Sequence, residues 1–200
     1  MKIAVLTNHF SGFDALKNLN FFDVPVNLII TNEKIESGRV ISGAYNFEKL
    51  GLEIFKLKDY DMKSDVEDLI MMKLDVLIVM GYQRLVPKRI IDSVKIASFG
   101  FHGSSEFLPK GRGRSPINWE LIKGKKKFIL HLFSLEPGPD SGNVIDFFQF
   151  DINLFDNCRT VYYKVSLAMR KMLEKNIPLL LKNKVLKGVS QKGEPTFFPK

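Results

Sequence analysis

The chain has 200 residues, of which 45% are hydrophobic and 26% are charged. This balance is typical of a soluble domain with a buried core, so the composition excludes a disordered chain. The length favours one domain over residues 1–200. The formal net charge of +8 favours anionic partners such as phosphates, nucleotides or nucleic acid.

Cysteine usage and apolar patterning indicate where the protein works. Cys158 is the only cysteine, which excludes an internal disulfide and a cysteine-based zinc site and fits a reducing compartment. The N-terminal apolar run is interrupted by Asn8 and His9, and no apolar stretch reaches the length of a membrane span. We therefore expect a cytoplasmic protein that does not enter a membrane.

The first half of the chain alternates short apolar runs with segments of helical periodicity. The apolar runs are typical of strands buried on both faces and cover residues 2–7, 26–31, 52–57 and 75–81. Helices are predicted over residues 13–19, 43–51 and 66–74, with Gly51 ending the second and Asp65 near the start of the third. This alternation predicts right-handed βαβ units and an α/β fold.

The second half continues the same pattern. Strands are predicted over residues 95–101, 127–133 and 143–152, and Ser115-Pro116 predicts a helix start with Ser115 as its N-cap. A long helix over residues 159–183 should be broken or bent at Pro178, and a short tail rich in turn formers follows it. The whole chain predicts a Rossmann-like, mostly parallel sheet with helices on both faces.

Ligands of such sheets bind at the carboxyl ends of strands. The turns at these ends cover residues 7–12, 81–87, 101–116 and 134–142. The loop from Gly100 to Trp119 concentrates glycines, prolines and arginines behind a histidine, and a rigid basic loop suits an anionic ligand. A plain connection before a helix explains these residues as well, and the residue types alone leave both interpretations open.

A series of short motifs follows His102. They are LPK at 108–110, RG at 112–113, SP at 115–116, NW at 118–119 and DSG at 140–142. This order resembles the catalytic core of the formyltransferases that use 10-formyltetrahydrofolate. Residues 76–87 are similar to the family's folate-holding strand and loop, and residues 167–181 and 191–200 to its closing helix and tail. The match at residues 108–119 most resembles the branch that formylates amino sugars carried on nucleotides, which is related to the methionyl-tRNA formyltransferase catalytic domain.

The resemblance implies an amine that attacks the formyl carbon of the folate, with His102 as proton acceptor and Asp140 orienting its ring. It implies 10-formyltetrahydrofolate as formyl donor, a nucleotide-linked amino sugar as acceptor, no metal and a homodimer. The implied folate-binding residues are Met80, Gly81, Tyr82, Arg84, Leu85, Val86, Pro109 and Gly138. The implied substrate-binding residues are Asn8, His9, Ser104, Lys110, Arg112, Gly113, Arg114, Ser115 and Asn118.

The chain departs from the family pattern at two places. Gly100 stands where the family has an asparagine that helps to stabilise the oxyanion, and the segment between His102 and Leu108 is two residues longer than usual. Ser104, Asn118 or a backbone N–H of residues 102–106 are candidates to replace the missing donor.

Other acceptors and other classes of protein remain alternatives. A glycinamide ribonucleotide formyltransferase should have a glycine-rich turn after the first strand, where residues 7–12 hold one glycine. A methionyl-tRNA formyltransferase normally has a further domain for tRNA, and nucleic acid is not expected as a partner here. Gly100 and the longer loop also allow a catalytically impaired folate- or nucleotide-binding protein. An ordinary nucleotide-binding Rossmann domain is disfavoured, because no Gly-x-Gly-x-x-Gly follows a strand.

Three further features have ordinary structural explanations. His131 lies in mid-strand and is expected to be a packed, hydrogen-bonded histidine. The run Lys125-Lys126-Lys127 is expected to be a solvated turn, because it lacks the interleaved aromatics of a nucleic-acid patch. Cys158 is expected to be an incidental small residue, because no base is predicted beside it.

Overall fold

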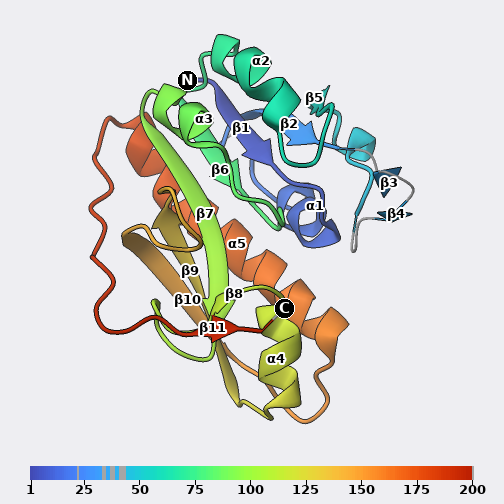
Figure 1. Ribbon diagram of the computed structural model, residues 1–200, viewed down its shortest axis with the longest axis vertical. Helices are drawn as coiled ribbons and strands as arrows, with labels where there is room; N and C mark the ends of the chain where they lie inside the picture. Colours follow the sequence, from blue (N-terminus) through green and yellow to red (C-terminus); the bar gives the residue numbers. More distant parts are fainter. Residues whose placement is uncertain (22, 33–34, 37–38, 41–43, 200) are drawn as a thin grey trace. The chain divides into compact units, whose positions relative to one another are not determined.

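The computed structural model describes the chain except residues 22, 33–34, 37–38, 41–43 and 200 (Figure 1). Its main sheet has seven strands in the order β10-β9-β7-β6-β1-β2-β5. The chain divides into two compact units, Met1–Phe99 and Gly100–Lys200, and the boundary falls within strand β7 (Ala97–Ser104). The mostly parallel α/β sheet predicted from the sequence is confirmed.

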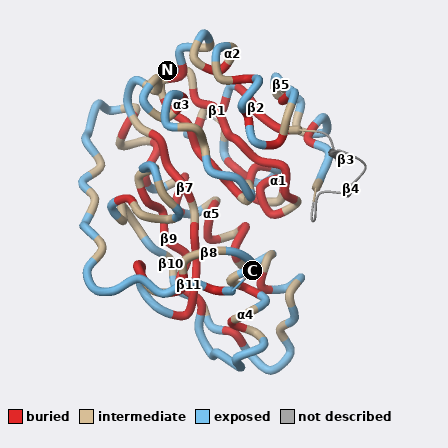
Figure 2. Tube along the Cα trace, viewed as in Figure 1, coloured by how far each residue is buried: buried red, intermediate tan, exposed pale blue. Residues whose placement is uncertain are grey.

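The first unit is built around β1 (Ile3–Leu6). This strand pairs in parallel with β2 (Val26–Thr31) on one side and with β6 (Val76–Val79) on the other, and β2 pairs in parallel with β5 (Glu53–Lys56). Every residue of β1 and β6 is buried (Figure 2), which explains why these segments are unbroken apolar runs.

Short helices and turns connect these strands. Helix α1 (Phe10–Lys17) follows β1, α2 (Val66–Met71) precedes β6, and α3 (Lys88–Ser93) packs against α2. The minor elements are β3 (Ile35–Glu36), β4 (Arg39–Val40), η1 (Glu48–Leu50) and η2 (Lys63–Asp65).

The second unit contains the antiparallel pair of β9 (Lys127–Ser134) and β10 (Val144–Asp151). Helix α5 (Cys158–Leu181) packs against both strands. Its first turn is closed by a capping box, in which the Asn157 side chain accepts from the Thr160 N–H and the Thr160 hydroxyl accepts from the Asn157 N–H.

The loop between β7 and β9 carries two small elements. Strand β8 (Arg112–Gly113) pairs in parallel with β11 (Phe197–Phe198) near the C-terminus, and helix α4 (Pro116–Ile122) follows β8. Phe197 and Phe198 are therefore held against the loop that follows His102.

Several sequence expectations need correction. The helix expected over 43–51 is a 3₁₀ turn at Glu48–Leu50 in its described part, and Gly43 lies outside the described residues. Helix α5 continues through Pro178 to Leu181, so it is not broken there. Ser115 is the N-cap residue of α4 but makes no capping hydrogen bond, because its backbone has a φ of 54° instead of the extended conformation that capping needs.

Among the described residues, no helix is long and apolar enough to cross a membrane.

Candidate active site

His102 and Asp140 come together in the second unit. The Nδ1 atom of His102 lies 3.4 Å from Oδ2 of Asp140, and the side chains are 7% and 20% exposed. His102 is in β7, and Asp140 is in the turn between β9 and β10, where its φ of 53° is left-handed. The same Oδ2 atom accepts a hydrogen bond of 3.2 Å from the Gly113 N–H. A buried histidine that faces a carboxylate is an arrangement suited to proton transfer.

Both ring nitrogens of His102 face oxygen atoms. Nε2 lies 2.6 Å from the carbonyl oxygen of Gly111, and Nδ1 faces Asp140. Carbonyl and carboxylate oxygens accept hydrogen bonds, so the ring can satisfy both only as a donor at both nitrogens. To take a proton at Nε2, the neutral ring must give up its contact with Gly111.

The C-terminal tail holds the loop that carries Gly111. The Gly111 N–H donates to the Thr196 hydroxyl at 2.9 Å, the Arg112 N–H donates to the Thr196 carbonyl at 2.9 Å, and the Thr196 N–H donates to the Pro109 carbonyl at 3.3 Å. Trp119 adds a bond from Nε1 to the Pro199 carbonyl at 3.2 Å. This tail therefore fixes the oxygen that His102 contacts.

Gln191 joins the two loops that meet at the histidine. Its side-chain NH₂ donates to the carbonyls of Asp140 at 2.8 Å and Gly142 at 2.7 Å, and its Oε1 accepts from the Arg112 guanidinium at 2.6 Å. The sequence resemblance covered this tail as a segment, but it did not single out Gln191. Nothing near Gln191 in the sequence signals contacts with residues 49 to 79 positions away.

Gly100 has no room for a side chain. A Cβ atom at this position would lie 2.8 Å from Cδ2 of Leu135 and 2.9 Å from Cζ of Phe133. The place of the family's asparagine is thus filled by two apolar side chains. An oxyanion donor must come from another residue.

Most of the candidate donors in the loop are already engaged. The Ser104 hydroxyl donates to the carbonyls of Glu106 and Lys110 and accepts from the Glu106 N–H. The Ser105 N–H donates to Oε1 of Glu120 at 2.9 Å. The Asn118 Oδ1 atom accepts from the Cys158 thiol at 2.9 Å, which leaves the Asn118 NH₂ without a partner among the described residues. Burial raises the pKa of Cys158, so this thiol is not an activated nucleophile.

A hollow of about 310 Å³ lies beside α4. Three of the expected substrate-binding residues line this hollow, namely Arg114, Ser115 and Asn118. The rest of the lining is Trp119, Ile122 and Pro199. Of the other expected contacts, Pro109 is buried, Lys110 is half-buried, Arg112 is bound by Gln191, and Gly138 is in the Asp140 turn.

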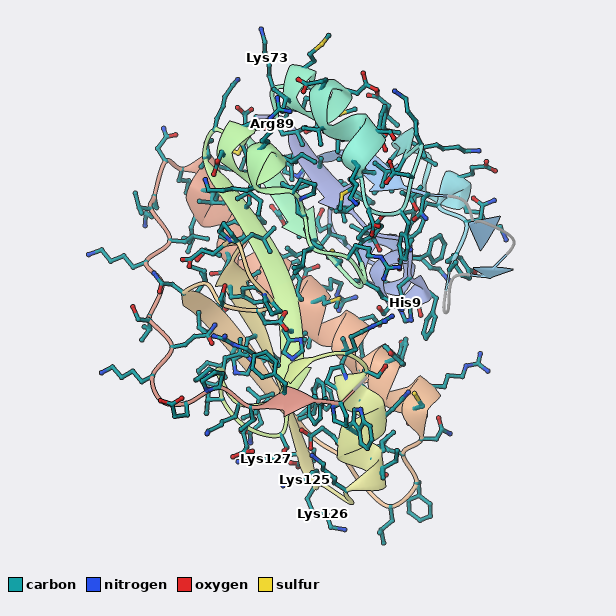
Figure 3. The ribbon with its side chains drawn as sticks, in the orientation of Figure 1. His9, Lys73, Arg89, Lys125, Lys126 and Lys127 are labelled. Carbon is teal, nitrogen blue, oxygen red and sulfur yellow. The ribbon has the colours of Figure 1, made fainter. Side chains whose placement is uncertain are left out.

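The first unit groups other expected site residues at the carboxyl ends of β1 and β6. His9 caps α1 (Figure 3), because its Nδ1 atom lies 3.2 Å from the Ser11 N–H and 2.8 Å from the Ser11 hydroxyl. Gly81 has a φ of 66°, and a Cβ atom there would lie 3.0 Å from Cβ of His9. Asn8 is buried and donates from Nδ2 to Asn32 at 3.2 Å. Asn8, His9 and Gly81 therefore lie side by side.

The loop after β6 is organised by residues that follow β5. The Tyr82 hydroxyl donates to the Tyr60 carbonyl at 2.9 Å. Arg84 pairs with Asp61 at 2.7 Å and lies 4.5 Å above the Tyr60 ring, so its guanidinium is already engaged. Met80 is buried, Val86 is half-buried, and Leu85 is 62% exposed. Leu85 offers an apolar surface at this strand end.

His131 is packed and hydrogen-bonded, as the sequence suggested. It is completely buried, its Nδ1 lies 3.2 Å from the His102 carbonyl, and its Nε2 has no partner among the described residues. Burial lowers the pKa of His131 to about 4, and burial likewise lowers the pKa of His9 to about 4. Among the described residues, no three His, Cys, Asp or Glu side chains are grouped to hold a metal ion.

Comparison with known proteins identifies the family. Residues 1–177 match the family described as formyl transferase. The chain belongs to the formyl transferase family.

Two curated relatives show how this formyl transferase compares in sequence. The bifunctional polymyxin resistance protein ArnA of Wigglesworthia glossinidia brevipalpis is 28% identical over 188 residues, which cover 92% of this chain and 28% of that protein. The methionyl-tRNA formyltransferase of Bacillus velezensis is 24% identical over 152 residues, which cover 76% of this chain and 47% of that protein. The chain thus spans less than half the length of these curated relatives.

Two solved structures share the fold of this formyl transferase. The N-formyltransferase from Helicobacter canadensis, in complex with folinic acid and dTDP-3-aminofucose, has a TM-score of 0.69 and 20% identity, over 99% of this chain and 70% of that one. Glycinamide ribonucleotide transformylase 1 from Symbiobacterium toebii has a TM-score of 0.71 and 15% identity, over 96% and 94%. Sugar and ribonucleotide formyltransferases are therefore equally similar in fold.

Gly100→Ala tests whether apolar side chains fill the asparagine position. We expect the free energy of unfolding to fall by about 1–3 kcal/mol, because the new methyl group overlaps Leu135 and Phe133. The double variant Gly100→Ala/Leu135→Ala should lose less than the sum of the two single variants, because the second change makes room for the first. Urea unfolding of the four proteins measures this coupling, and strict additivity would contradict the packing described.

His9 and His131 should make stability depend on pH. Their folded-state pKa values of about 4 lie below the ordinary 6.5, so the unfolded chain binds protons that the folded chain does not. Stability is full above pH 6.5 and should fall as the pH is lowered, by about 2 kcal/mol for each histidine by about pH 5. His9→Asn keeps an N-cap and should remove about half of the histidine contribution. If the slope of the unfolding free energy against pH is the same in His9→Asn as in the unaltered protein, this prediction is wrong.

Proposed function

We propose that this formyl transferase moves a formyl group from 10-formyltetrahydrofolate to the amine of a nucleotide-linked amino sugar. In this proposal both units work as one catalytic domain. The observation that carries the chemistry is the pair formed by the buried His102 and the half-buried Asp140, 3.4 Å apart, in the region that resembles the family's catalytic core.

The reaction exchanges one carbon–nitrogen bond for another. The acceptor amine forms a bond to the formyl carbon, the bond from that carbon to the folate nitrogen breaks, and one proton passes from the amine to the folate nitrogen. His102 takes this proton at Nε2 and returns it to the leaving nitrogen. Asp140 holds the ring by Nδ1 and stabilises the imidazolium between the two transfers.

Negative charge develops on the formyl oxygen during the attack, and Gly100 offers no side chain to bind it. Of the replacements named from the sequence, the NH₂ group of Asn118 has no partner among the described residues, and the protonated His102 ring is a second donor. Oxyanion donors typically contribute about 2.7–4 kcal/mol to lowering the barrier.

The choice of folate as donor is supported by the Helicobacter canadensis relative, whose structure contains folinic acid. The loop after β6 fits a flat heterocycle, since Leu85 presents an apolar side chain that is 62% exposed. Arg84 already pairs with Asp61, so we do not assign it to the folate's glutamate.

An amino sugar is favoured over glycinamide ribonucleotide by the turn after β1. Gly12 is the single glycine of this turn, and a Cβ atom there would overlap the Thr7 side chain. Close packing on Thr7 therefore accounts for this glycine without a phosphate. The side-chain ammonium of Lys110 has no partner among the described residues and supplies positive charge near the site for an anionic acceptor.

Mass spectrometry tests the proposed reaction. The protein is incubated with 10-formyltetrahydrofolate and a panel of nucleotide-linked amino sugars, with glycinamide ribonucleotide and methionyl-tRNA included for comparison. We expect a formyl amide, which adds one carbonyl group, on an amino sugar. His102→Ala should slow its formation by about 10²–10⁴-fold, while Lys182→Ala, an exposed change in α5's C-cap, should not.

The comparison acceptors make the outcome decisive. Formylation of glycinamide ribonucleotide or methionyl-tRNA without any sugar product would overturn the acceptor assignment and leave the donor assignment intact. Absence of every formyl product would overturn both.

A further inference from the structure

The second unit contains a larger hollow, of about 530 Å³, at the start of β9. One wall is the extended loop after β7, and the other is the lysine turn that leads into β9. Figure 3 shows the three lysine side chains of this turn gathered at one end of the unit. The lining residues are Ser105, Glu106, Phe107, Lys125, Lys126, Lys127 and Ile129. We call this hollow the lysine pocket.

Glu120 ties both walls of the lysine pocket together. This residue is 3% exposed, its Oε1 accepts from the Ser105 N–H at 2.9 Å, and its backbone carbonyl accepts from the Lys125 N–H at 3.0 Å. The two extra residues after His102 are thus anchored by a buried carboxylate. The pocket has fixed walls, as a preformed ligand site requires.

The charge of the lysine pocket is positive and unpaired. Lys125, Lys126 and Lys127 are exposed, and none forms an ion pair within the described part of the chain. Glu106 is the only acidic residue that lines the pocket. Three neighbouring ammonium groups repel one another, so an anion between them gains favourable interactions with all three.

The opposite side of the lysine pocket is apolar and aromatic. Phe107 is 51% exposed, and its ring packs edge-on against Phe147 at 4.9 Å and His131 at 5.6 Å. Ile129, which also lines the pocket, is completely buried. A ligand that matches both sides combines an anionic group with a flat ring.

The lysine pocket lies on the same face of the sheet as His102. A Cβ atom on Gly103 would meet the Phe128 ring, and side chains alternate along a strand, so His102 points to the face opposite Phe128. Lys127 and Ile129 flank Phe128 in β9 and point to that same face. The Nδ1 atom of His131 contacts the His102 carbonyl, and Lys127 lies four residues before His131 in β9. Lys127 and His131 are therefore about 13 Å apart along the strand. Only an extended ligand can reach both places.

We infer that the lysine pocket binds the nucleoside diphosphate part of the acceptor, with the phosphates on the lysines and the base on Phe107. This inference rests on the proposed function, because it assigns the nucleotide of the same acceptor a place. It differs from the sequence expectation, which gave Lys110, Arg112 and Arg114 as substrate-binding residues, and of these Arg112 is already engaged. Its guanidinium is bound by Gln191.

Calorimetric titration of dTDP and of inorganic pyrophosphate into the full chain tests the inference without a reaction. The variant Lys125→Ala/Lys126→Ala/Lys127→Ala should weaken both ligands by about 10-fold or more. The matched control Lys182→Ala/Lys184→Ala/Lys187→Ala removes the same charge from exposed positions outside the pocket and should change each Kd by less than about 2-fold.

The aromatic side has its own test. Phe107→Leu preserves an apolar side chain but removes the ring, and it should weaken the binding of dTDP several-fold while leaving the binding of pyrophosphate unchanged.

The two triple-lysine variants decide the inference. If the pocket variant and the control variant lose the same affinity for dTDP and pyrophosphate, or if neither loses any, the inference is overturned.

The binding experiment also separates this inference from the proposed function. Lysine-dependent dTDP binding by a protein that formylates no amino sugar would leave the pocket standing and refute the function. If the protein formylates an amino sugar and the triple-lysine pocket variant does so equally well, the proposed function stands and the pocket assignment is refuted.

Discussion

The carboxylate of Asp140 accepts from the Gly113 N–H at 3.2 Å and faces Nδ1 of His102 at 3.4 Å. This one group connects the turn after β9 to the loop after β7 and sets the orientation of the histidine ring. Its position depends in turn on Gln191, which binds the Asp140 carbonyl from the C-terminal tail. In the proposed reaction, a carboxylate placed this way gives the histidine a fixed direction in which to carry the proton between the two nitrogens.

The departures from the family pattern have a common structural basis in β7. At Gly100, the space that the family's asparagine side chain would occupy is filled by Phe133 and Leu135. These two side chains pack against the face of β7 to which His102 points. Beyond His102, the two additional residues form a wall anchored by Glu120. The unit thus lacks a polar donor within β7 and has a positively charged hollow beyond the end of that strand.

The sequence predicted the parts of this protein that local patterns determine. Buried parallel strands are continuous apolar runs, so 26–31 was predicted with the observed bounds of β2. Of the break or bend expected at Pro178, the break does not occur, because α5 packs along β9 and β10 and this tertiary packing outweighs one lost hydrogen bond. The pairing of His102 with Asp140 followed from motif resemblance, whereas Gln191 and Glu120 were missed. Each acts through contacts distant in sequence, which no local spacing reveals.

The rate of formyl transfer by Asp140→Asn tests the central claim most directly. The Oδ2 atom of Asp140 contacts both Gly113 and His102, so an asparagine oxygen in its place would keep both contacts but would lack the negative charge that stabilises the His102 imidazolium. The expected result is a folded protein whose single-turnover rate falls by about 100-fold or more, while the control Asp151→Asn, at an exposed end of β10, stays near the unaltered rate. An unaltered rate in Asp140→Asn would contradict it.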